Sequence, residues 1–383
     1  MNKEKKFTVF IAAGESSADR CAAELVKTAS KKDPTVHFTG LASEYSKKAG
    51  MTVLLDISNY STVGFVESLP FILPLLKAYF KIKRYLKQIQ PDLFIPIDNQ
   101  GFNMLCVKAA KSLGIPVYYY IAPQEWHWGT EKGGEKVLES VDKILAIFPQ
   151  EAQFYKQLGG DAVYVGHPVM ERVKPFMKVG KKDAILSIFP GSREQEIRRL
   201  LPLFLEVGQR FCKAHNLGMH VSIANPHYED LIKDIIAKSP YGQQVLCERG
   251  NSLDLMSRSQ LSLVASGTVS LEHALLSVPH VVAYKLSAGT NFILNTFMKR
   301  IKERVTYMSM ANSLLKQEVF PEFFQHKATA EALYKGLTQM LEKQDSVKQQ
   351  CQKLVEQLDK GAVSERLFDE IKQLKDSTRA VFK

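Results

Sequence analysis

Short apolar runs alternate with helical patterns along the chain, in two successive series. Each run has the length of a buried strand, and the stretches between them place apolar residues at helical spacing. This alternation is typical of parallel sheets whose strands are connected by helices. Strands are expected at 7–13, 36–39, 52–55, 93–97, 116–121, 143–148 and 162–165 in the first series, and at 184–189, 219–224, 244–247, 261–265 and 280–284 in the second.

The length of 383 residues suits two domains rather than one. Residues 169–183 are basic, contain a proline and a glycine, and separate the two series, so they are expected to form a linker. We therefore predict an α/β fold with two Rossmann-like domains, at 1–170 and 171–362. Beyond Lys327 the pattern is helical and polar, with helices near 328–342, 345–359 and 363–375.

The net charge of +11 favours acidic partners, such as nucleic acid, anionic lipid or a phosphorylated substrate. Five scattered cysteines without metal-ligand spacing predict free thiols in a reducing compartment. The amino terminus has no apolar segment of signal-peptide type, and no run approaches the roughly 18 apolar residues of a membrane span. A cytosolic protein that touches at most a membrane surface is expected.

A basic amphipathic stretch occupies residues 69–87, LPFILPLLKAYFKIKRYLK. Its apolar face is wider than a half-buried helix needs, and five lysines and arginines flank it, which is typical of a helix at a membrane interface. A helix packed in the core of an α/β layer is the alternative. Residues 292–304 repeat this chemistry, so contact with anionic lipid is expected through both stretches. No nucleic-acid-binding motif accompanies the basic residues.

Polar side chains follow three strands of the first series, where ligands bind in open α/β sheets. Gly14 allows a sharp turn after the first strand, and Glu15 follows it as a candidate for orienting reacting groups. Asp98 comes directly after four apolar residues, and apolar walls can raise a carboxylate pKa toward that of a general base. A helix cap is the alternative role for Asp98. Glu125 and His127 flank Trp126 in the third loop, where a packed histidine is as plausible as a catalytic one.

Two turns of the second series are suited to bind phosphate. LSIFPGSREQEIRRL at 186–200 predicts a buried strand, a turn at Pro190 and Gly191, and a helix with Ser192 as its N-cap. Free amides and the helix dipole attract an anion there, and Arg193 can bind two phosphate oxygens. An ordinary strand–helix turn with a surface arginine is the alternative.

The second such turn is Ser266-Gly267-Thr268, which precedes a helix containing Glu272. Hydroxyls and amides at a helix start suit phosphate, and a carboxylate one turn later suits a ribose diol. Together the two turns indicate a nucleoside diphosphate. The sequence lacks the glycine-rich motifs of P-loop and NAD-binding proteins and any cluster with metal spacing, so no cofactor and no metal are expected.

Eight blocks of the chain together resemble the lipid-A-disaccharide synthases, GT-B glycosyltransferases of Gram-negative bacteria whose two domains face each other across a cleft. The blocks are AGESSAD at 13–19, GFVE at 64–67, IDNQGFN at 97–103, FPQE at 148–151, VGHP at 165–168, FPGSREQEI at 189–197, ASGTVSLEHALLSVPHVVAYKLS at 265–287 and NSLLKQEVFPEFFQ at 312–325.

The resemblance implies an inverting, metal-independent transfer. UDP-linked 2,3-diacylglucosamine would be joined to 2,3-diacylglucosamine 1-phosphate (lipid X) through a β-1,6 bond, with release of UDP. It also implies a peripheral protein at the cytoplasmic face of the inner membrane. The carboxyl-terminal helix, here about 363–383, is expected to return to the first domain. A homo-oligomer is left open.

Site residues carry over by position. Asp98 resembles the family's proposed base, and Arg193 resembles its diphosphate-binding arginine, with Glu15 as the third catalytic candidate. The donor side would comprise Gly191, Ser192, Arg193, Ser266, Gly267, Thr268, Glu272 and Asn312. The acceptor or lipid side would comprise Gly14, Ser17, Glu67, Asn103 and Trp126.

The chain departs from the family pattern mainly on the acceptor side. Gln100 and Gly101 replace a proline and an aspartate, and Gly129 replaces an arginine; further departures are Ala18, Ala122 and Ala311. Acyl-chain preference and acceptor identity therefore stay open. Two alternatives remain: another UDP-sugar GT-B enzyme, such as an epimerase or a transferase with a different lipid acceptor, and a catalytically inactive protein that binds membrane surfaces.

Overall fold

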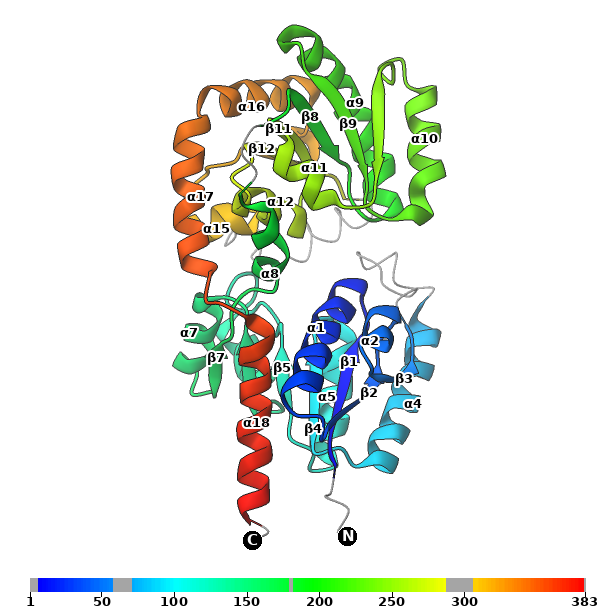
Figure 1. The fold of residues 1–383 in the computed structure, drawn as a ribbon, viewed down its shortest axis with the longest axis vertical. Helices are drawn as coiled ribbons and strands as arrows, with labels where there is room; N and C mark the ends of the chain where they lie inside the picture. Colours follow the sequence, from blue (N-terminus) through cyan, green and yellow to red (C-terminus); the bar gives the residue numbers. More distant parts are fainter. Residues whose placement is uncertain (1–5, 58–70, 179–181, 287–305, 382–383) are drawn as a thin grey trace. The chain divides into compact units, whose positions relative to one another are not determined.

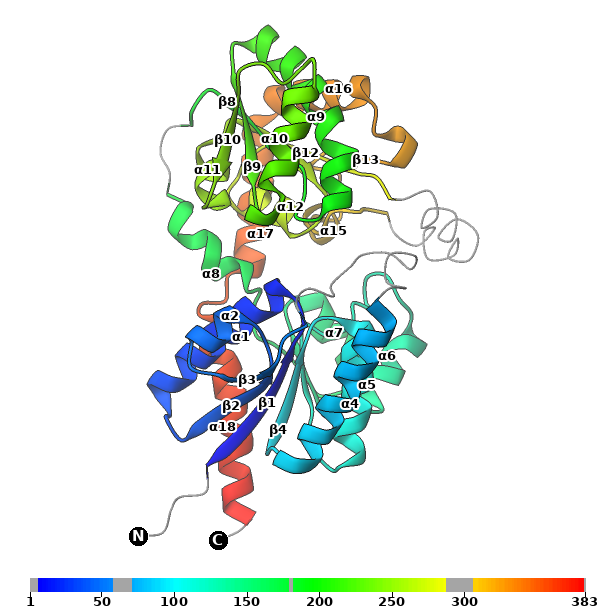
Figure 2. The same ribbon diagram turned by 90° about the vertical axis from the view of Figure 1, so that its right-hand side faces the viewer.

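The computed structural model describes residues 6–57, 71–178, 182–286 and 306–381. The chain divides into two compact units. Unit 1 comprises Met1–Pro168 and Lys360–Lys383, and unit 2 comprises Val169–Asp359. Each unit is an α/β layer structure built on one parallel sheet (Figures 1 and 2). No helix of the described ranges is long and apolar enough to cross a bilayer.

The sheet of unit 1 has the strand order β3-β2-β1-β4-β5-β6-β7, and neighbouring strands run parallel. The order reverses between β1 and β4, which are nearly or fully buried because helices cover both faces of the sheet. In Figure 2, α1 and α18 lie on one face and α4 and α5 on the other. The strands are β1 (Phe7–Ala13), β2 (Val36–Leu41), β3 (Thr52–Leu55), β4 (Leu93–Ile97), β5 (Tyr118–Tyr120), β6 (Lys143–Ala146) and β7 (Ala162–Tyr164). The helices are α1 (Ser16–Lys32), α2 (Glu44–Lys48), α4 (Ile72–Ile89), α5 (Gln100–Ser112), α6 (Glu131–Leu138), α7 (Pro149–Gln157) and α18 (Val363–Val381).

Unit 2 repeats this topology with the order β10-β9-β8-β11-β12-β13, again all parallel. The order reverses between β8 and β11, and both strands are fully buried. The strands are β8 (Ile185–Phe189), β9 (Gly218–Ile223), β10 (Val245–Arg249), β11 (Leu261–Ala265), β12 (His280–Tyr284) and β13 (Glu322–Phe324). The α-helices are α8 (Val169–Val173), α9 (Glu194–His215), α10 (Glu229–Lys238), α11 (Ser252–Arg258), α12 (Thr268–Leu275), α15 (Met310–Leu315), α16 (Ala330–Glu342) and α17 (Gln344–Leu358), with 3-10 turns η3 (Lys174–Phe176), η4 (Pro226–Tyr228) and η5 (Gln325–Lys327).

The segment expected to be a linker, 169–183, is instead helical at its start. The side chains of Val169, Met170 and Val173 in α8 are buried, and α8 packs against α12 of the same unit. These three apolar side chains share one helical face, and burying that face lowers the free energy of the chain more than leaving it in solvent as a linker. Strand β13 was not predicted, because its three residues are too few to give a periodic signal.

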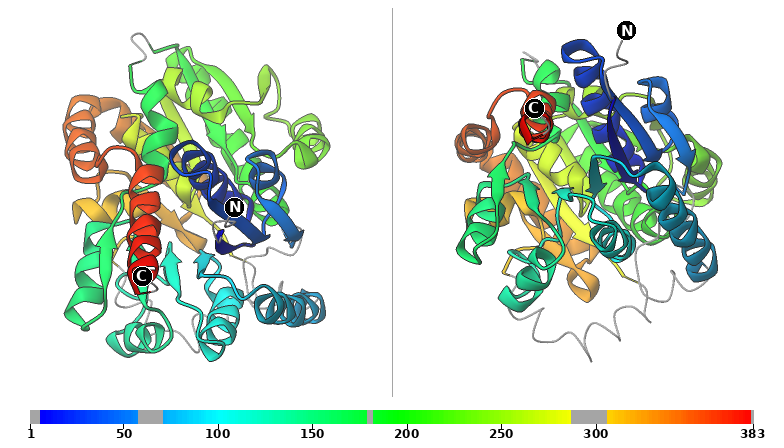
Figure 3. Two further views of the ribbon diagram at one scale, coloured as in Figure 1. Left: turned by 60° about the horizontal axis from the view of Figure 1, so that its bottom comes forward. Right: turned by 90° about the horizontal axis from the view of Figure 1, so that it is seen from below.

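Helix α18 packs against α1 (Figures 1 and 3). Its Lys375 is 3% exposed and forms an ion pair with Asp33, which follows α1. Burial acts to raise the pKa of Asp33, but hydrogen bonds from Lys375 and Thr35 outweigh it and lower that pKa to about 2. Glu370 of α18 also pairs with Lys143 at the start of β6, at 2.8 Å. These contacts fix the carboxyl-terminal helix on unit 1.

Helix α4, from the basic stretch 69–87, is both core-packed and exposed. Ala78, Ile82 and Leu86 are buried against the sheet. Its other apolar flank faces solvent: Leu73 is 70% exposed and Phe80 63%. The stretch 292–304, with the same expected chemistry, lies outside the described residues, as does Glu67.

Candidate functional site

The predicted site residues follow the four strands at which the two sheets reverse their order. In unit 1, Gly14 and Glu15 follow β1, and Asp98 follows β4, its neighbour in the sheet. In unit 2, the Gly191–Arg193 turn follows β8, and the Ser266–Thr268 turn follows β11, its neighbour. In open α/β sheets ligands bind at such reversal points, because neighbouring connections leave on opposite faces. Each unit therefore brings its two predicted loops together.

One carboxylate organises the first donor-side turn. Glu196, which is 7% exposed, accepts a hydrogen bond from the Ser192 amide at 3.1 Å and one from Arg193 Nη1 at 3.0 Å. Gly191 has a φ of 115°, and a Cβ there would lie 2.4 Å from Glu196 Oε2. The turn thus needs glycine both for its backbone and for the approach of Glu196. The N-cap of α9 is Arg193, not Ser192 as predicted, because the backbone of Arg193 is still extended, with φ −121° and ψ 145°.

The second donor-side turn begins α12. Gly267 is the N-cap with a φ of 151°, and Ser266 and Thr268 flank it at the surface of the unit. Below the turn, the ring of His273 contacts Phe189 at the end of β8, at 4.7 Å between centroids. Burial lowers the pKa of His273 well below its usual value, so the ring is a neutral support. The two turns are therefore joined through the core.

Two residues predicted to lie on the donor side, Glu272 and Asn312, form contacts within unit 2. The carboxylate of Glu272 is 5% exposed and pairs with Arg172 of α8 at 2.9 Å. The amide of Asn312 uses all of its capacity inside the unit: Nδ2 donates to Phe320 O and Glu322 Oε1, and Oδ1 accepts from the amides of residues 319 and 320. Asn312 therefore holds α15 to the segment entering β13 and has no polar atom left for a ligand.

The acceptor-side turn after β4 has an unusual backbone. Asp98 and Asn99 both have a positive φ, of 55° and 46°. The Asp98 carbonyl accepts hydrogen bonds from Tyr119 Oη at 3.0 Å and Asn103 Nδ2 at 2.8 Å, and Asp98 Oδ1 accepts from the Asn99 amide. Such a conformation persists only where surrounding contacts hold it, and it is common at functional sites. The structure thus holds the Asp98 carboxylate at the sheet edge.

The side-chain nitrogen of Asn103 has a positioning role. It is fully buried, and its Nδ2 lies within hydrogen-bond distance of the carbonyls of Ala12, Ile97 and Asp98. These atoms belong to the ends of β1 and β4, so Asn103 connects the two strands of the reversal point. Ser17, by contrast, is exposed on the first turn of α1.

Aromatic rings pack against one another in the loop after β5. Trp126 packs on His127 and on Phe148, with ring centroids 5.1 and 5.5 Å apart, and Phe148 in turn packs on His167. Burial lowers the pKa of His127 to about 4, which makes it a weak base. Of the two interpretations left open for His127, the packed one fits better.

Glu125 connects two of the departures from the family pattern. Its Oε1 accepts from Gln100 Nε2 at 3.2 Å, and its Oε2 accepts from the Thr130 amide at 3.1 Å. A Cβ on Gly129 would lie 1.8 Å from Glu125 Oε2. The glycine at 129 therefore makes room for this carboxylate, and the glutamine at 100 binds it. Changes 29 residues apart in sequence form one local contact.

Sequence reasoning assigned no role to the carboxylates of Glu151 and Glu322 and did not foresee what Glu196 binds. All three lie inside sequence blocks that resemble the family, but such a resemblance does not show which atoms are in contact.

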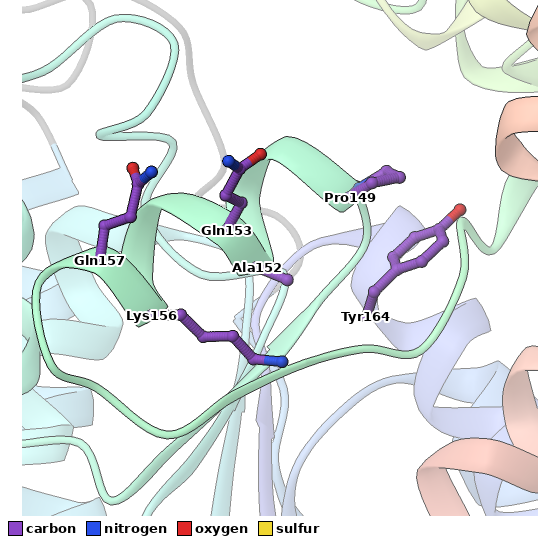
Figure 4. Close-up of a pocket in the computed structure, with 6 residues that line it drawn as sticks. All are labelled: Pro149, Ala152, Gln153, Lys156, Gln157 and Tyr164. Atoms are coloured by element: carbon purple, nitrogen blue, oxygen red, sulfur yellow. The ribbon is translucent and has the colours of Figure 1, made fainter.

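A surface depression on unit 1 contains none of the predicted site residues (Figure 4). Its lining residues are Pro149, Ala152, Gln153, Lys156, Gln157 and Tyr164. Among the described residues, no group of three or more histidines, cysteines and carboxylates could hold a metal ion.

The sequence profile of the lipid-A-disaccharide synthetase family matches residues 9–373. The chain belongs to this family. A lipid-A-disaccharide synthase of Geobacter metallireducens is 33% identical over 372 residues, covering 94% of this chain and 95% of the relative. One of Gloeothece citriformis is 32% identical over 383 residues, covering 95% and 98%. The recognition from sequence blocks is thereby confirmed, and with it the assignment as a glycosyltransferase of lipid A biosynthesis.

Solved structures confirm the fold. A Neisseria meningitidis UDP-GlcNAc 2-epimerase bound to UDP-GlcNAc superposes with a TM-score of 0.63 at 11% identity, covering 96% of this chain and 100% of that one. Acinetobacter baumannii MurG gives a TM-score of 0.55 at 15% identity, covering 96% and 99%. The predicted GT-B fold is correct, and at these identities the likeness concerns the fold alone.

Proposed function

We propose that this chain transfers 2,3-diacylglucosamine from UDP to the 6-hydroxyl of 2,3-diacylglucosamine 1-phosphate, forming a β-1,6 bond with inversion and releasing UDP. Family membership supports the reaction class. The observation that carries the site assignment is the placement of the predicted acid and the two anion-binding turns at the sheet-reversal points of their units. The substrates themselves come from the resemblance.

On the donor side, the UDP diphosphate would bind at the turns that follow β8 and β11. Backbone amides at the start of α9 and α12 offer donors to phosphate oxygens, and the guanidinium of Arg193 adds a fixed positive charge. Negative charge grows on the β-phosphate oxygen as the bond to the sugar breaks. Arg193 is therefore assigned to stabilise the leaving UDP, and we propose that this guanidinium serves in place of a metal ion.

On the acceptor side, Asp98 would act as general base. Its carboxylate accepts the proton of the acceptor 6-hydroxyl while that oxygen bonds to the anomeric carbon from the face opposite UDP, which departs with the bonding electron pair. A single displacement of this kind inverts the configuration. Glu15, half-buried at the start of α1 beside the same reversal point, is assigned to orient the acceptor.

We further propose that the protein works as a peripheral protein on an anionic membrane surface, at the cytoplasmic face of the inner membrane. The exposed apolar flank of α4 includes Leu73, Leu76 and Phe80, and Lys77, Lys81 and Arg84 are exposed on the same helix. Apolar insertion beside cationic side chains is the usual mode of interfacial helices. Both substrates carry acyl chains, so such a surface would also supply them.

The decisive experiment incubates the purified protein with UDP-2,3-diacylglucosamine and lipid X in detergent. We expect a disaccharide 1-phosphate and one UDP per disaccharide, unaffected by EDTA. A reaction without lipid X tests the main alternative: conversion of soluble UDP-N-acetylglucosamine without an acceptor would identify an epimerase instead. If well-folded protein binds UDP and lipid yet forms no product with any acceptor, the proposal fails and a binding protein is the better explanation.

A further inference from the structure

A buried carboxylic acid that feels the charge of the proposed base has no role in the mechanism so far. Glu151, the last residue of the FPQE block, is 1% exposed in the first turn of α7. Its Oε2 accepts hydrogen bonds from the amides of Ile147 at 2.8 Å and Phe148 at 3.3 Å, at the end of β6. Its Oε1 is buried and has no hydrogen-bond partner.

Helix capping explains the position of only one of the two carboxylate oxygens of Glu151. A glutamate three residues after the N-cap often reaches back to the N-cap amide, as Oε2 does here. Capping glutamates usually keep their second oxygen in water. Leaving a buried carboxylate oxygen without a partner costs free energy, and such atoms in native proteins call for an explanation. A proton on Oε1 removes the larger part of that cost, because the buried group is then neutral.

Glu151 connects the strand ends that carry the acceptor-side loops. Besides the two amides at the end of β6, the amide of Ala122 after β5 stabilises the ionised form of Glu151. The charge of Asp98 after β4 destabilises that ionised form. One turn along α7, Tyr155 Oη donates to the carbonyl of Pro123 at 2.7 Å and ties the same helix to the loop after β5. The ends of β5 and β6 therefore meet at this one acid, and the charge of Asp98 at the end of β4 acts on it.

We propose that Glu151 is a positioning residue for Asp98: as a neutral acid it joins the ends of β5 and β6 and adds no second negative charge on this side of Asp98. The inference rests on the proposed role of Asp98 as the base. It concerns a residue that would act through Asp98 and need not touch substrate.

The protonation of Glu151 agrees with this geometry. Burial raises the pKa of Glu151 to about 8, the amides of Ile147, Phe148 and Ala122 partly oppose this, and the charge of Asp98 raises it further. The acid is then mostly neutral at pH 7 and ionises above about pH 8. Ionisation would place a second negative charge beside Asp98 and the anionic acceptor, which slows the reaction.

The other ionisable groups on the elements around Glu151 include the three tyrosines of β5, Lys143 on β6, Tyr155 and Lys156 on α7 and Tyr164 on β7. Glu125 and His127 lie in the loop after β5, and His167 follows β7. Burial raises the pKa values of Tyr119 and Tyr155 far above 10 and lowers that of His127 to about 4. These three groups therefore stay neutral between pH 7 and pH 9.

The test is the pH profile of kcat/KM for Glu151→Gln, because the amide has the shape of the neutral acid and cannot ionise. We expect kcat/KM within about threefold of wild type at pH 7. Wild type should lose about tenfold in kcat/KM per pH unit above its pKa, and the variant should not. Glu139→Gln, at an exposed glutamate of the same unit, is the matched control and should keep the wild-type profile. Any change of kcat/KM with pH that comes from ionisation of the substrates should appear in this control as well. An unchanged alkaline limb in Glu151→Gln, or activity lost equally at all pH values, overturns the inference.

A second measurement needs no substitution at 151. Difference infrared spectra of wild type between about pH 7 and pH 9 should lose a carboxylic-acid carbonyl band. Asp98→Asn should keep this transition but shift it to lower pH, since the charge that raises the pKa of Glu151 is gone. Absence of the band in wild type, or no shift in Asp98→Asn, contradicts the inference. The two proposals fail separately: an active Asp98→Asn rejects the base, whereas an inactive one combined with an unchanged Glu151→Gln profile rejects only the role of Glu151.

Discussion

Arg193 Nη1 donates a hydrogen bond to Glu196 Oε1 at 3.0 Å, across one turn at the start of α9. The arginine is 40% exposed and the glutamate 8% by side chain, so a buried acid fixes a cation that still faces solvent. A guanidinium held in this way needs little reorganisation when a phosphate arrives. This arrangement is what a site that stabilises developing charge requires.

Replacing Arg193 by alanine should lower kcat by about 100-fold and raise the donor KM much less, because the charge is needed most as UDP departs. Steady-state kinetics with varied donor would check this. Arg198→Ala is the matched control, since Arg198 pairs with Glu194 on the exposed side of the same helix and should leave kcat unchanged. Near-normal kcat with only a raised KM in Arg193→Ala would mean ground-state binding alone.

Asp98→Asn should reduce turnover by at least about 100-fold, the usual contribution of a general base. UDP affinity, measured by calorimetry, should not change, because the turns proposed to bind UDP lie in the other unit. The side-chain oxygen can still accept from the Asn99 amide, so the turn should keep its shape. Comparable activity in this variant would remove Asp98 from the mechanism.

Gly129→Ala should destabilise unit 1 by about 1–3 kcal/mol, since the new methyl group collides with the Glu125 carboxylate. The acceptor KM should rise because Glu125 would lose its contact with Gln100. The double variant Glu125→Ala, Gly129→Ala removes the collision with the carboxylate but keeps a 2.8 Å approach to the Cα of residue 125, so it should recover part of the lost stability. Chemical unfolding of the three proteins measures the coupling, and simple additivity would show that the two positions are independent.

Leu73→Ser combined with Phe80→Ser should weaken binding to vesicles containing anionic lipid. These side chains are 70% and 63% exposed, so the folded state should be unaffected, while two apolar groups that could enter the bilayer are lost. Flotation with vesicles at low and high salt provides the measurement. Leu246→Ser is the control, because Leu246 is 58% exposed on β10 of unit 2 and outside the proposed surface. Equal loss of binding in the control would exclude a specific role for α4.

Lys375→Met should destabilise the protein by about 3 kcal/mol at neutral pH, because it leaves the Asp33 carboxylate without its buried partner. The folded-state pKa of Asp33, about 2, lies below its ordinary value of 3.8. The stabilisation is therefore fully present above about pH 4 and is lost as the pH falls toward 2. Unfolding measured between pH 2 and pH 7 should show this acid loss in wild type and a weaker one in Lys375→Met. Parallel curves would indicate that the pair contributes nothing.

The prediction of the fold succeeded where a local pattern repeats. The buried runs at 7–13, 93–97 and 261–265 coincide with β1, β4 and β11, because a strand covered on both faces must be apolar throughout. The prediction failed where the local signal was weak. Residues 169–173 looked like a linker, since five residues cannot show whether a helical face has a partner, and β13 is too short to be periodic.

The candidate site divides in the same way. Residue type and position after a strand were enough to select Asp98 and the Gly191–Arg193 turn. They could not show that the side-chain amide of Asn312 forms all of its hydrogen bonds within unit 2, or that Glu272 pairs with Arg172. The partners of Asn312 lie beyond the end of its own helix and Arg172 lies in another helix, so no local propensity encodes these roles.

By itself the sequence determined the class of fold, the family and the loops that carry polar side chains, because strand-length apolar runs and turn residues act over a few positions of the chain. Tertiary structure alone decided the strand order, and with it that β1 adjoins β4 and β8 adjoins β11. It also decided that Glu272 pairs with Arg172 and that Glu151 is buried at the ends of β5 and β6. The reason is physical: a carboxylate takes its pKa and its function from the amides, charges and solvent around it, and folding gathers those from segments that the sequence keeps apart.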